Sequence, residues 1–251
     1  MTSTTTPLYS LMGISKSFGQ VEALKGVDME VFKGEIIGLV GDNGAGKSTL
    51  IKILSGIYAQ NSGTIRCEGK PVRIGSYRDS QNLGIATIYQ DRALVDSVSI
   101  YRNIFMGNEI ITPLRFLDKK RMRQEADRVL NESISIGIKS PDQMVGDLSG
   151  GQKQAVAIAR AIYFRARLLL LDEPTNALSV KESQQVMNFV KNLRTEGISS
   201  IFVTHNLLHV YTIADRFVIL SHGEKVGDFR KEEITMEQLE KMIVTGKART
   251  K

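Results

Sequence analysis

A glycine-rich run early in the chain contains residues whose types and spacing suit phosphate binding. Residues 41–49 read Gly-Asp-Asn-Gly-Ala-Gly-Lys-Ser-Thr, which fits the pattern G-x-x-x-x-G-K-[ST] without a mismatch. A short apolar run, residues 35–40, precedes it, and residues 47–55 after it have helical character. Because the pattern requires a strand before the loop and a helix after it, the sequence predicts a phosphate-binding loop.

Each residue type in this run has a chemical role. The glycines let the backbone turn tightly, so that several N–H groups point inward at the start of a helix dipole. We expect Lys47 to reach the outer phosphates and the Ser48 hydroxyl to ligate Mg²⁺, a cation that prefers oxygen. The predicted nucleotide-binding residues are Gly41, Asp42, Asn43, Gly44, Ala45, Gly46, Lys47, Ser48 and Thr49.

Two acids follow a second apolar run, Arg167-Leu-Leu-Leu-Leu-Asp172. A continuous apolar run suits a strand that is buried on both faces of a parallel sheet. Asp172 would hold Mg²⁺ directly or through water, and Glu173 would act as the general base toward a hydrolytic water. Two acids after a strand are also common structural punctuation; the phosphate loop in the same chain favours the functional interpretation.

A second glycine-rich turn, residues 148–152, reads Leu-Ser-Gly-Gly-Gln and precedes a helix that we expect to begin near Gln152. A serine and glycines before a helix again make an anion site from a helix N-terminus. The predicted anion-binding residues are Ser149, Gly150, Gly151 and Gln152. The alternative interpretation is a serine N-cap with a simple glycine turn.

Together, the phosphate loop, LSGGQ and the Asp-Glu pair, in this order and spacing, resemble the ATPase subunit of an ABC transporter over about residues 8–230. The resemblance implies an α/β fold: a P-loop NTPase (RecA-like) core with an antiparallel β subdomain and an inserted helical subdomain at about 91–165. The ATPase domain would span residues 7–245, between flexible termini at 1–6 and 246–251. The implied cofactors are ATP and Mg²⁺.

The same resemblance assigns roles to three further residues. Phe18 matches the aromatic residue that stacks on adenine, although a phenylalanine here could also be a core residue. Gln90 matches the glutamine that contacts Mg²⁺ and the attacking water and links the site to a membrane partner. His205 matches the switch histidine that touches the γ-phosphate. The expected catalytic residues are therefore Glu173, His205, Gln90 and Lys47, and the expected metal ligands are Ser48, Gln90 and Asp172.

One position departs from the family's pattern. The segment after Pro174-Thr commonly reads S-A-L-D in the family, whereas residues 176–179 here read Asn-Ala-Leu-Ser. The missing aspartate usually helps to couple the two active sites of a dimer. The departure at Ser179 leaves the strength of that coupling open, while hydrolysis need not be lost.

The rest of the chain alternates strand-like and helical segments, as an α/β protein does. The segment 8–33 has β character, and residues 63–69, 84–89, 198–203 and 216–220 are predicted strands. Met122, Ala126, Val129, Leu130 and Ile134 form one apolar stripe of a helix, and Val186 to Leu193 belong to another.

Composition limits the class of partner. No uncharged apolar run approaches the ~18–20 residues that a membrane span needs, and the first seven residues have no secretory hydrophobic core. The single cysteine, Cys67, fits a reducing cytosol. The net charge of +6 is scattered rather than clustered, and there is no tryptophan for stacking on bases, so no nucleic-acid partner is expected.

The resemblance also implies an assembly. LSGGQ of one chain would close over ATP on the phosphate loop of another in a homodimer, and this dimer would drive membrane permease subunits at the cytoplasmic face of a bacterial inner membrane. The wording around the motifs is similar to importers of simple sugars such as ribose, xylose and fructose, which implies a sugar-binding protein as an indirect partner. A soluble ABC ATPase acting on nucleic acid or ribosomes, and an exporter ATPase, are the alternatives.

Overall fold

The computed structural model describes residues 6–88, 94–133, 138–176 and 178–247. Its contacts divide the chain into two compact units. The first unit contains residues 1–87, 167–173 and 190–251, and the second contains residues 88–166 and 174–189. Gln90, Ala177, Ile134 and the outermost terminal residues lie outside the described ranges.

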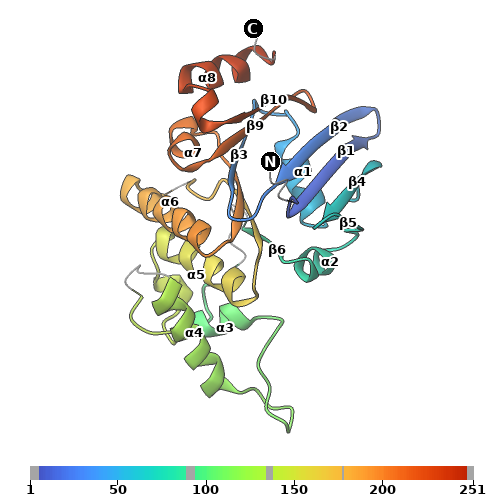
Figure 1. The fold of residues 1–251 in the computed structure, drawn as a ribbon. Helices are drawn as coiled ribbons and strands as arrows, with labels where there is room; N and C mark the ends of the chain where they lie inside the picture. Colours follow the sequence, from blue (N-terminus) through green and yellow to red (C-terminus); the bar gives the residue numbers. More distant parts are fainter. Residues whose placement is uncertain (1–5, 89–93, 134–137, 177, 248–251) are drawn as a thin grey trace. The chain divides into compact units, whose positions relative to one another are not determined.

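An antiparallel sheet forms one part of the first unit (Figure 1). Its strand order is β2-β1-β4-β5. Strand β1 pairs with β2 on one side and with β4 on the other, and β4 pairs with β5. The strands are β1 Tyr9–Phe18, β2 Val21–Val31, β4 Ser62–Cys67 and β5 Lys70–Val72.

The second sheet is mostly parallel, with the order β10-β9-β3-β8-β7-β6. Strand β3 pairs in parallel with β8 and β9, and β7 with β8, while β10 pairs antiparallel with β9. Every residue of β3 and β8 is buried, including the two serines that begin β8, Ser199 and Ser200. The strands are β3 Ile36–Val40, β6 Ile85–Ile88, β7 Leu168–Asp172, β8 Ser199–Val203, β9 Arg216–Ser221 and β10 Glu224–Arg230.

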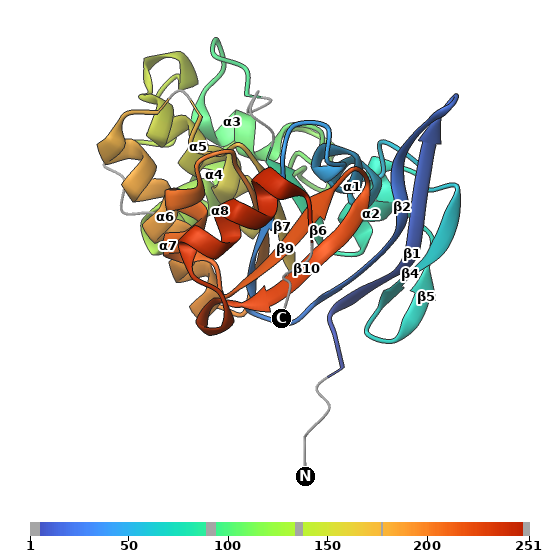
Figure 2. The ribbon, with the colours of Figure 1, turned by 90° about the horizontal axis from the view of Figure 1, so that it is seen from above.

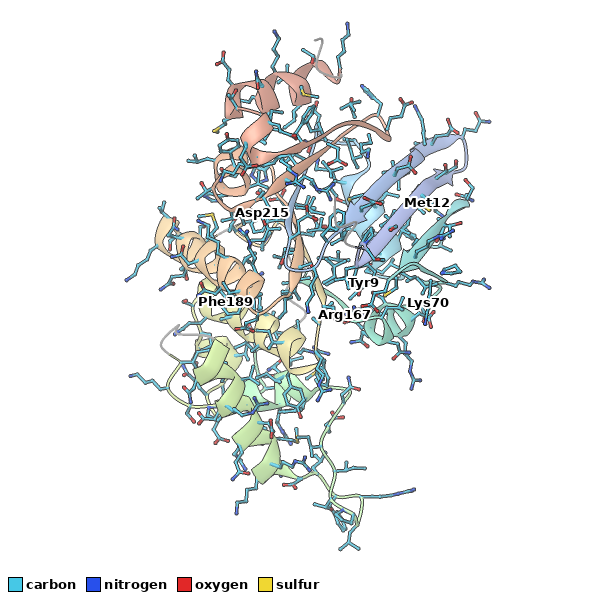
Figure 3. The ribbon with its side chains drawn as sticks, in the orientation of Figure 1. Tyr9, Met12, Lys70, Arg167, Phe189 and Asp215 are labelled. Carbon is cyan, nitrogen blue, oxygen red and sulfur yellow. The ribbon has the colours of Figure 1, made fainter. Side chains whose placement is uncertain are left out.

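Helix α1, Lys47–Leu54, contributes to a core that both sheets share. Its buried residues Leu50, Ile51, Ile53 and Leu54 join side chains of β1, β2 and β4 and of the parallel strands in one cluster. Near this core Arg167, just before β7, forms an ion pair with Glu68 and lies close to Tyr9 (Figure 3). Helix α1, which follows the phosphate loop, therefore packs against side chains of both sheets.

Helices α7, Leu207–Ile213, and α8, Met236–Thr245, cover β3 and β9 (Figure 2). A Cβ on Gly38 of β3 would lie 2.6 Å from a Val210 methyl of α7, so this helix packs directly on the strand. The Asp215 carboxylate, labelled in Figure 3, accepts a hydrogen bond of 2.9 Å from the Ile36 N–H and joins the starts of β9 and β3. The short helix α2 spans Tyr77–Asn82.

The second unit is mainly helical. Its helices α3, α4 and α5 pack against one another, and Asn103 of α3 bonds to the backbone of Val95 and Val98. The predicted apolar stripe of α4 is confirmed at Met122, Ala126, Val129 and Leu130, which are buried. The helices are α3 Ile100–Phe105, α4 Lys119–Ser133 and α5 Gly150–Tyr163, with α6 Val180–Thr195 continuing into the first unit. Within the described ranges, none of the helices combines the length and the apolar character that a membrane span requires.

Candidate nucleotide site

The phosphate loop connects β3 to α1, as the sequence predicts. Gly46, at the N-cap of α1, has a left-handed φ of 104°, and no side chain of the described residues caps this helix. The N–H groups of the first turn are therefore left to a ligand or to water. They form the start of a helix dipole that favours an anion.

Two of the loop glycines are required because neighbouring backbone atoms leave no room for a Cβ. Gly41 has φ 149°, and a Cβ there would lie 2.2 Å from the Leu220 carbonyl oxygen. A Cβ on Gly46 would lie 2.7 Å from the Ala23 carbonyl oxygen. Gly44 has φ 77° but open space around it, so its requirement is conformational alone.

Lys47 folds back over the loop. Its ammonium donates to the carbonyl oxygens of Gly41 at 2.7 Å and Asp42 at 2.9 Å. Burial lowers the pKa of Lys47, while the negative charges of Glu173, Asp42 and Asp172 oppose that shift. The predicted phosphate-binding lysine thus lies in the same electrostatic environment as the two predicted carboxylates.

The remaining loop residues differ in exposure. Ala45 is buried; its N–H donates to the Asp42 carbonyl, and its own carbonyl accepts from the Gly223 N–H. Ser48 lies exposed in the first turn of α1 and Thr49 is half-buried. Asp42, Asn43 and Gly44 are exposed.

Asp172 ends β7, at the carboxyl edge of the parallel sheet. Burial and, next, the charge of Glu173 raise its pKa, against the lowering effect of Lys52 and Lys47. No cluster of three or more His, Cys, Asp or Glu suited to a metal is found within the described residues. One carboxylate and one hydroxyl, Asp172 and Ser48, nevertheless fit Mg²⁺, which is usually bound by one or two protein oxygens together with phosphates and water.

Glu173 adopts a left-handed backbone with φ 52°, which is uncommon for a residue with a side chain. Its N–H donates to the Val203 carbonyl at 2.9 Å, which holds the turn against the end of β8. The carboxylate accepts from the Thr204 hydroxyl at 3.1 Å and from the His205 N–H at 3.0 Å. Its Oε2 is 3.0 Å from Nδ1 of His205. The structure therefore brings two predicted catalytic residues, Glu173 and His205, into contact.

Phe18, the predicted adenine-stacking residue, ends β1 and is 42% exposed, so it is not a core residue. Its ring meets that of Tyr58 edge to face, with the centroids 5.0 Å apart. The ammonium of Lys16 lies 5.2 Å from the Phe18 centroid, and Lys52 lies 5.5 Å from that of Tyr58. The result is a partly exposed aromatic pair with cations around it.

The LSGGQ segment lies in the second unit, and α5 begins at Gly150, two residues earlier than predicted. Ser149 is the N-cap. Its side chain accepts from the Gln152 N–H at 3.3 Å, and the Gln152 side chain accepts from the Ser149 N–H at 3.0 Å. This reciprocal pair is a capping box, which explains the earlier start of the helix.

Glu182 of α6 also reaches the start of α5, although it is not among the predicted site residues. Its Oε1 accepts from the Gly151 N–H at 3.1 Å. Glu182 stands three residues after Ser179, an S-x-x-E spacing that signals a capping box and so could have singled out the residue. Thr204, the Glu173 partner, was also missed, and no short motif identifies it.

The structure thus gathers Lys47, Asp172, Glu173 and His205 within the first unit, with Phe18 on β1 of the same unit. Ser149, Gly150, Gly151 and Gln152 form a separate helix start in the second unit. Gln90, expected as a catalytic residue and a metal ligand, lies outside the described residues.

Comparisons with known proteins match these observations. A family model described as "ABC transporter" matches residues 24–176. The chain is 45% identical to a xylose/arabinose import ATP-binding protein of Sulfolobus acidocaldarius, over 95% of this chain and 94% of the relative. It is 39% identical to a fructose import ATP-binding protein of Rhizobium meliloti, over 92% and 91% of the two chains.

A ribose import ATP-binding protein of Caldanaerobacter subterraneus subsp. tengcongensis is 39% identical over 95% of this chain, which spans only 48% of that longer relative. Among solved structures, a nucleotide-free ATP-binding cassette from an ABC transporter matches with a TM-score of 0.80 and 25% identity, over 95% of both chains. The fold class predicted from the sequence is confirmed. The chain belongs to the ABC transporter family, as an ATPase with the fold of an ATP-binding cassette.

Proposed function

We propose that this chain is the ATP-hydrolysing subunit of a membrane importer for a simple sugar. The observation that carries the proposal is the 45% identity to a xylose/arabinose import ATP-binding protein over nearly the full length of both chains. The ribose and fructose import relatives support the same class of cargo. None of the site residues would touch the sugar, so the choice among monosaccharides rests with other subunits.

In this proposal the first unit binds and hydrolyses ATP. The N–H groups at the start of α1 and the Lys47 ammonium hold the phosphates, and Phe18 stacks on the adenine. Ser48 and Asp172 would hold Mg²⁺, which would neutralise phosphate charge when bound, and Gln90 would complete its contacts. The site thereby lowers the cost of the charge that develops on the transferred phosphoryl group.

Glu173 acts as the general base. One carboxylate oxygen takes a proton from water as the water oxygen attacks the γ-phosphorus, and the bond from that phosphorus to the bridging oxygen of ADP breaks. The bonds from Thr204 and His205 fix the carboxylate. His205, whose side chain is mostly exposed, orients the γ-phosphate.

The active unit is a homodimer in which Ser149, Gly150, Gly151 and Gln152 of one chain close over ATP on the phosphate loop of its partner. A two-fold symmetric pair forms both composite sites with one kind of interface. ATP favours the closed pair because it contacts both chains, and loss of the γ-phosphate favours opening. We place the dimer on permease subunits at the cytoplasmic face of the membrane, with a sugar-binding protein on the other side.

The proposal extends to the organisation of the chain. We assign the segment of about 91–165 to an inserted helical subdomain within an ATPase domain of residues 7–245. Its part at about 91–150 passes the opening and closing of the dimer to the permease. The expected terminal segments, 1–6 and 246–251, lie mostly outside the described residues. The basic residues are scattered among acidic ones along the sequence, which gives no support to a nucleic-acid partner.

The proposal is tested by trapping the assembly. The Glu173→Gln form would be expressed in the source organism, held with ATP and Mg²⁺, and extracted from membranes in mild detergent. Recovery of a multi-spanning permease with two copies of this chain is the expected result, and a companion binding protein would then be tested against a panel of monosaccharides. Recovery with ribosomes or nucleic acid in the soluble fraction would contradict the importer.

A kinetic measurement checks the assignment of the base. Glu173→Gln is expected to lower the rate of ATP hydrolysis by about 10²–10⁴-fold while ATP binding is retained. The parental chain, measured in the same preparation series, is the control. Hydrolysis by the variant at the parental rate would assign the base to another residue.

A further inference from the structure

Glu182 lies in the first turn of α6 and uses its two carboxylate oxygens on two different segments. Oε1 accepts a hydrogen bond of 3.1 Å from the N–H of Gly151, at the start of α5. Oε2 accepts from both the N–H and the hydroxyl of Ser179, at 3.0 and 2.8 Å. All of these residues belong to the second compact unit. The carboxylate therefore forms a bridge that joins Ser179, just before α6, to Gly151, which lies 31 residues before Glu182 along the chain.

On the α5 side, packing against Gly151 restricts the Glu182 side chain. A Cβ added to Gly151 would lie 3.1 Å from both Cβ and Cγ of Glu182, so the aliphatic part of the side chain lies against the glycine backbone. On the α6 side, the Ser179 hydroxyl oxygen also accepts from the Glu182 N–H at 3.3 Å, which completes a reciprocal cap. The glutamate is thus held by packing on one side and by a capping box on the other.

The charge of Glu182 matches this location. Hydrogen bonds from Gly151, from both donors of Ser179 and from the Ser149 hydroxyl lower the pKa of Glu182 to about 2. The carboxylate is therefore ionised at neutral pH. It lies near the first turns of α5 and α6, where a helix dipole favours negative charge.

We propose that Glu182 is a positioning residue that joins the Ser149–Gln152 segment to the segment carrying Ser179. The two segments would then approach a partner's ATP site in one fixed arrangement. This inference rests on the proposed function, because it takes the composite site of the dimer as given. The inference gives a structural role to Ser179, which stands where the family's S-A-L-D pattern has an aspartate. Ser179 supplies an N-cap and a hydroxyl donor where an aspartate would supply a second carboxylate.

The bridge leads to an unusual expectation for Ser179→Asp, which restores the family's common residue. An aspartate beside Glu182 would replace a donor with a like charge, so the bridge would open rather than strengthen. Glu182→Gln gives a second test. Glutamine keeps the shape but has one acceptor oxygen instead of two, so it can serve Gly151 or Ser179 but not both.

The experiment measures ATP-driven dimerisation in a Glu173→Gln background by analytical ultracentrifugation. Adding Glu182→Gln or Ser179→Asp is expected to raise the ATP concentration for half-maximal dimerisation about tenfold, the effect of losing one hydrogen bond to a charged group. Binding of a fluorescent ATP analogue to the monomer should be unchanged. Gln238→Ala is the matched control, because Gln238 belongs to a capping box at the start of α8 in the other unit.

Amide hydrogen exchange of the monomer separates the bridge from the dimer. In Glu182→Gln, exchange is expected to rise together in residues 149–152 and 179–182, with no change there in Gln238→Ala. Unchanged exchange and unchanged dimerisation would overturn the bridge. If the Glu173→Gln parent itself did not dimerise with ATP, the composite site would be wrong, while the exchange data would still decide whether Glu182 joins the two segments.

Discussion

Helices α1 and α5 both begin beside glycines, but they differ in whether side chains accept hydrogen bonds from their first N–H groups. No side chain of the described residues caps α1, and its N-cap is a glycine in the left-handed conformation. The start of α5 is capped by Ser149 and Gln152, and Glu182 also accepts from Gly151. One helix start is left open, and the other already holds protein acceptors.

The charges near the two starts differ as well. The Lys47 ammonium lies over the loop before α1, whereas the Glu182 carboxylate lies at the start of α5. An anionic ligand is attracted to the first arrangement and repelled by the charge in the second. We therefore expect the free chain to bind nucleotide at the start of α1 alone, and the start of α5 to act only when a partner presents ATP to it.

The largest expected effect tests this contrast directly. Lys47→Ala removes the ammonium that lies over the loop and should weaken ATP binding and lower hydrolysis by at least about 100-fold. Ser149→Ala should leave the affinity of the free chain for ATP unchanged. Titration with a fluorescent ATP analogue measures both. Equal weakening by the two variants would mean that both helix starts bind nucleotide in one chain.

The next effect concerns the backbone of the open start. Gly41→Ala places a Cβ 2.2 Å from the Leu220 carbonyl, where backbone must move, and should lower the free energy of unfolding by about 3 kcal/mol. Gly44→Ala meets open space and pays only for its positive φ, about 1 kcal/mol. Urea denaturation of the two variants measures both losses in the free energy of unfolding. Equal losses would show that conformation alone, and not close approach, requires the glycines.

Neutralising one carboxylate at each site should change stability with opposite signs. The folded pKa of Asp172 is raised, mainly by burial, so its ionised form costs stability at neutral pH, and Asp172→Asn should raise the free energy of unfolding. The folded pKa of Glu182 is lowered to about 2, so Glu182→Gln should lower the free energy of unfolding; solvent screening of this accessible carboxylate limits the loss to about 1 kcal/mol.

The pH dependence gives the control for this pair. The contribution of Glu182 is complete above its ordinary value near 4.5 and is lost as the pH falls toward 2. The gain from Asp172→Asn should shrink as the pH falls through the range in which Asp172 is protonated. Denaturant unfolding at pH 7 and at acid pH measures both trends. A stability gain from Glu182→Gln at pH 7 would contradict the charge contrast.

The smallest effect compares two serine caps. Ser149→Ala removes the N-cap of α5 and Ser76→Ala that of α2, and each should cost about 1 kcal/mol of stability. ATP hydrolysis should fall only in Ser149→Ala, because Ser76 caps a helix remote in sequence from both glycine-rich turns. Thermal unfolding and steady-state hydrolysis, measured side by side, separate capping from function. Loss of hydrolysis in both variants would reduce Ser149 to a structural residue.

Local patterns made much of this molecule predictable. The phosphate loop could be placed between β3 and α1 because an apolar run, glycines and a lysine follow one another without interruption. The strand β7 could be read from Leu168–Asp172 because burial on both faces selects a continuous apolar run. The stripe of α4 followed from its helical period.

Contacts between distant segments were not predictable in this way. The Glu173 bonds to Thr204 and His205 join the ends of neighbouring parallel strands, β7 and β8, and their pairing is set by sheet order, which no local pattern encodes. The link from Glu182 to Gly151 depends on how α5 and α6 pack. Helix α5 starts at Gly150, before the expected Gln152, because Ser149 and Gln152 form a capping box that the prediction did not include.

Mixing two inactive variants tests the central claim most directly, namely that one ATP is bound by the phosphate loop of one chain and by the α5 start of another. Lys47→Ala and Ser149→Arg would each be inactive alone but would form one intact composite site in a mixed dimer. An equimolar mixture should regain up to about a quarter of the parental hydrolysis, since about half the dimers are mixed and each holds one intact site. A mixture that stays as inactive as its components, or a Ser149→Arg chain that hydrolyses ATP at the parental rate, would contradict the account.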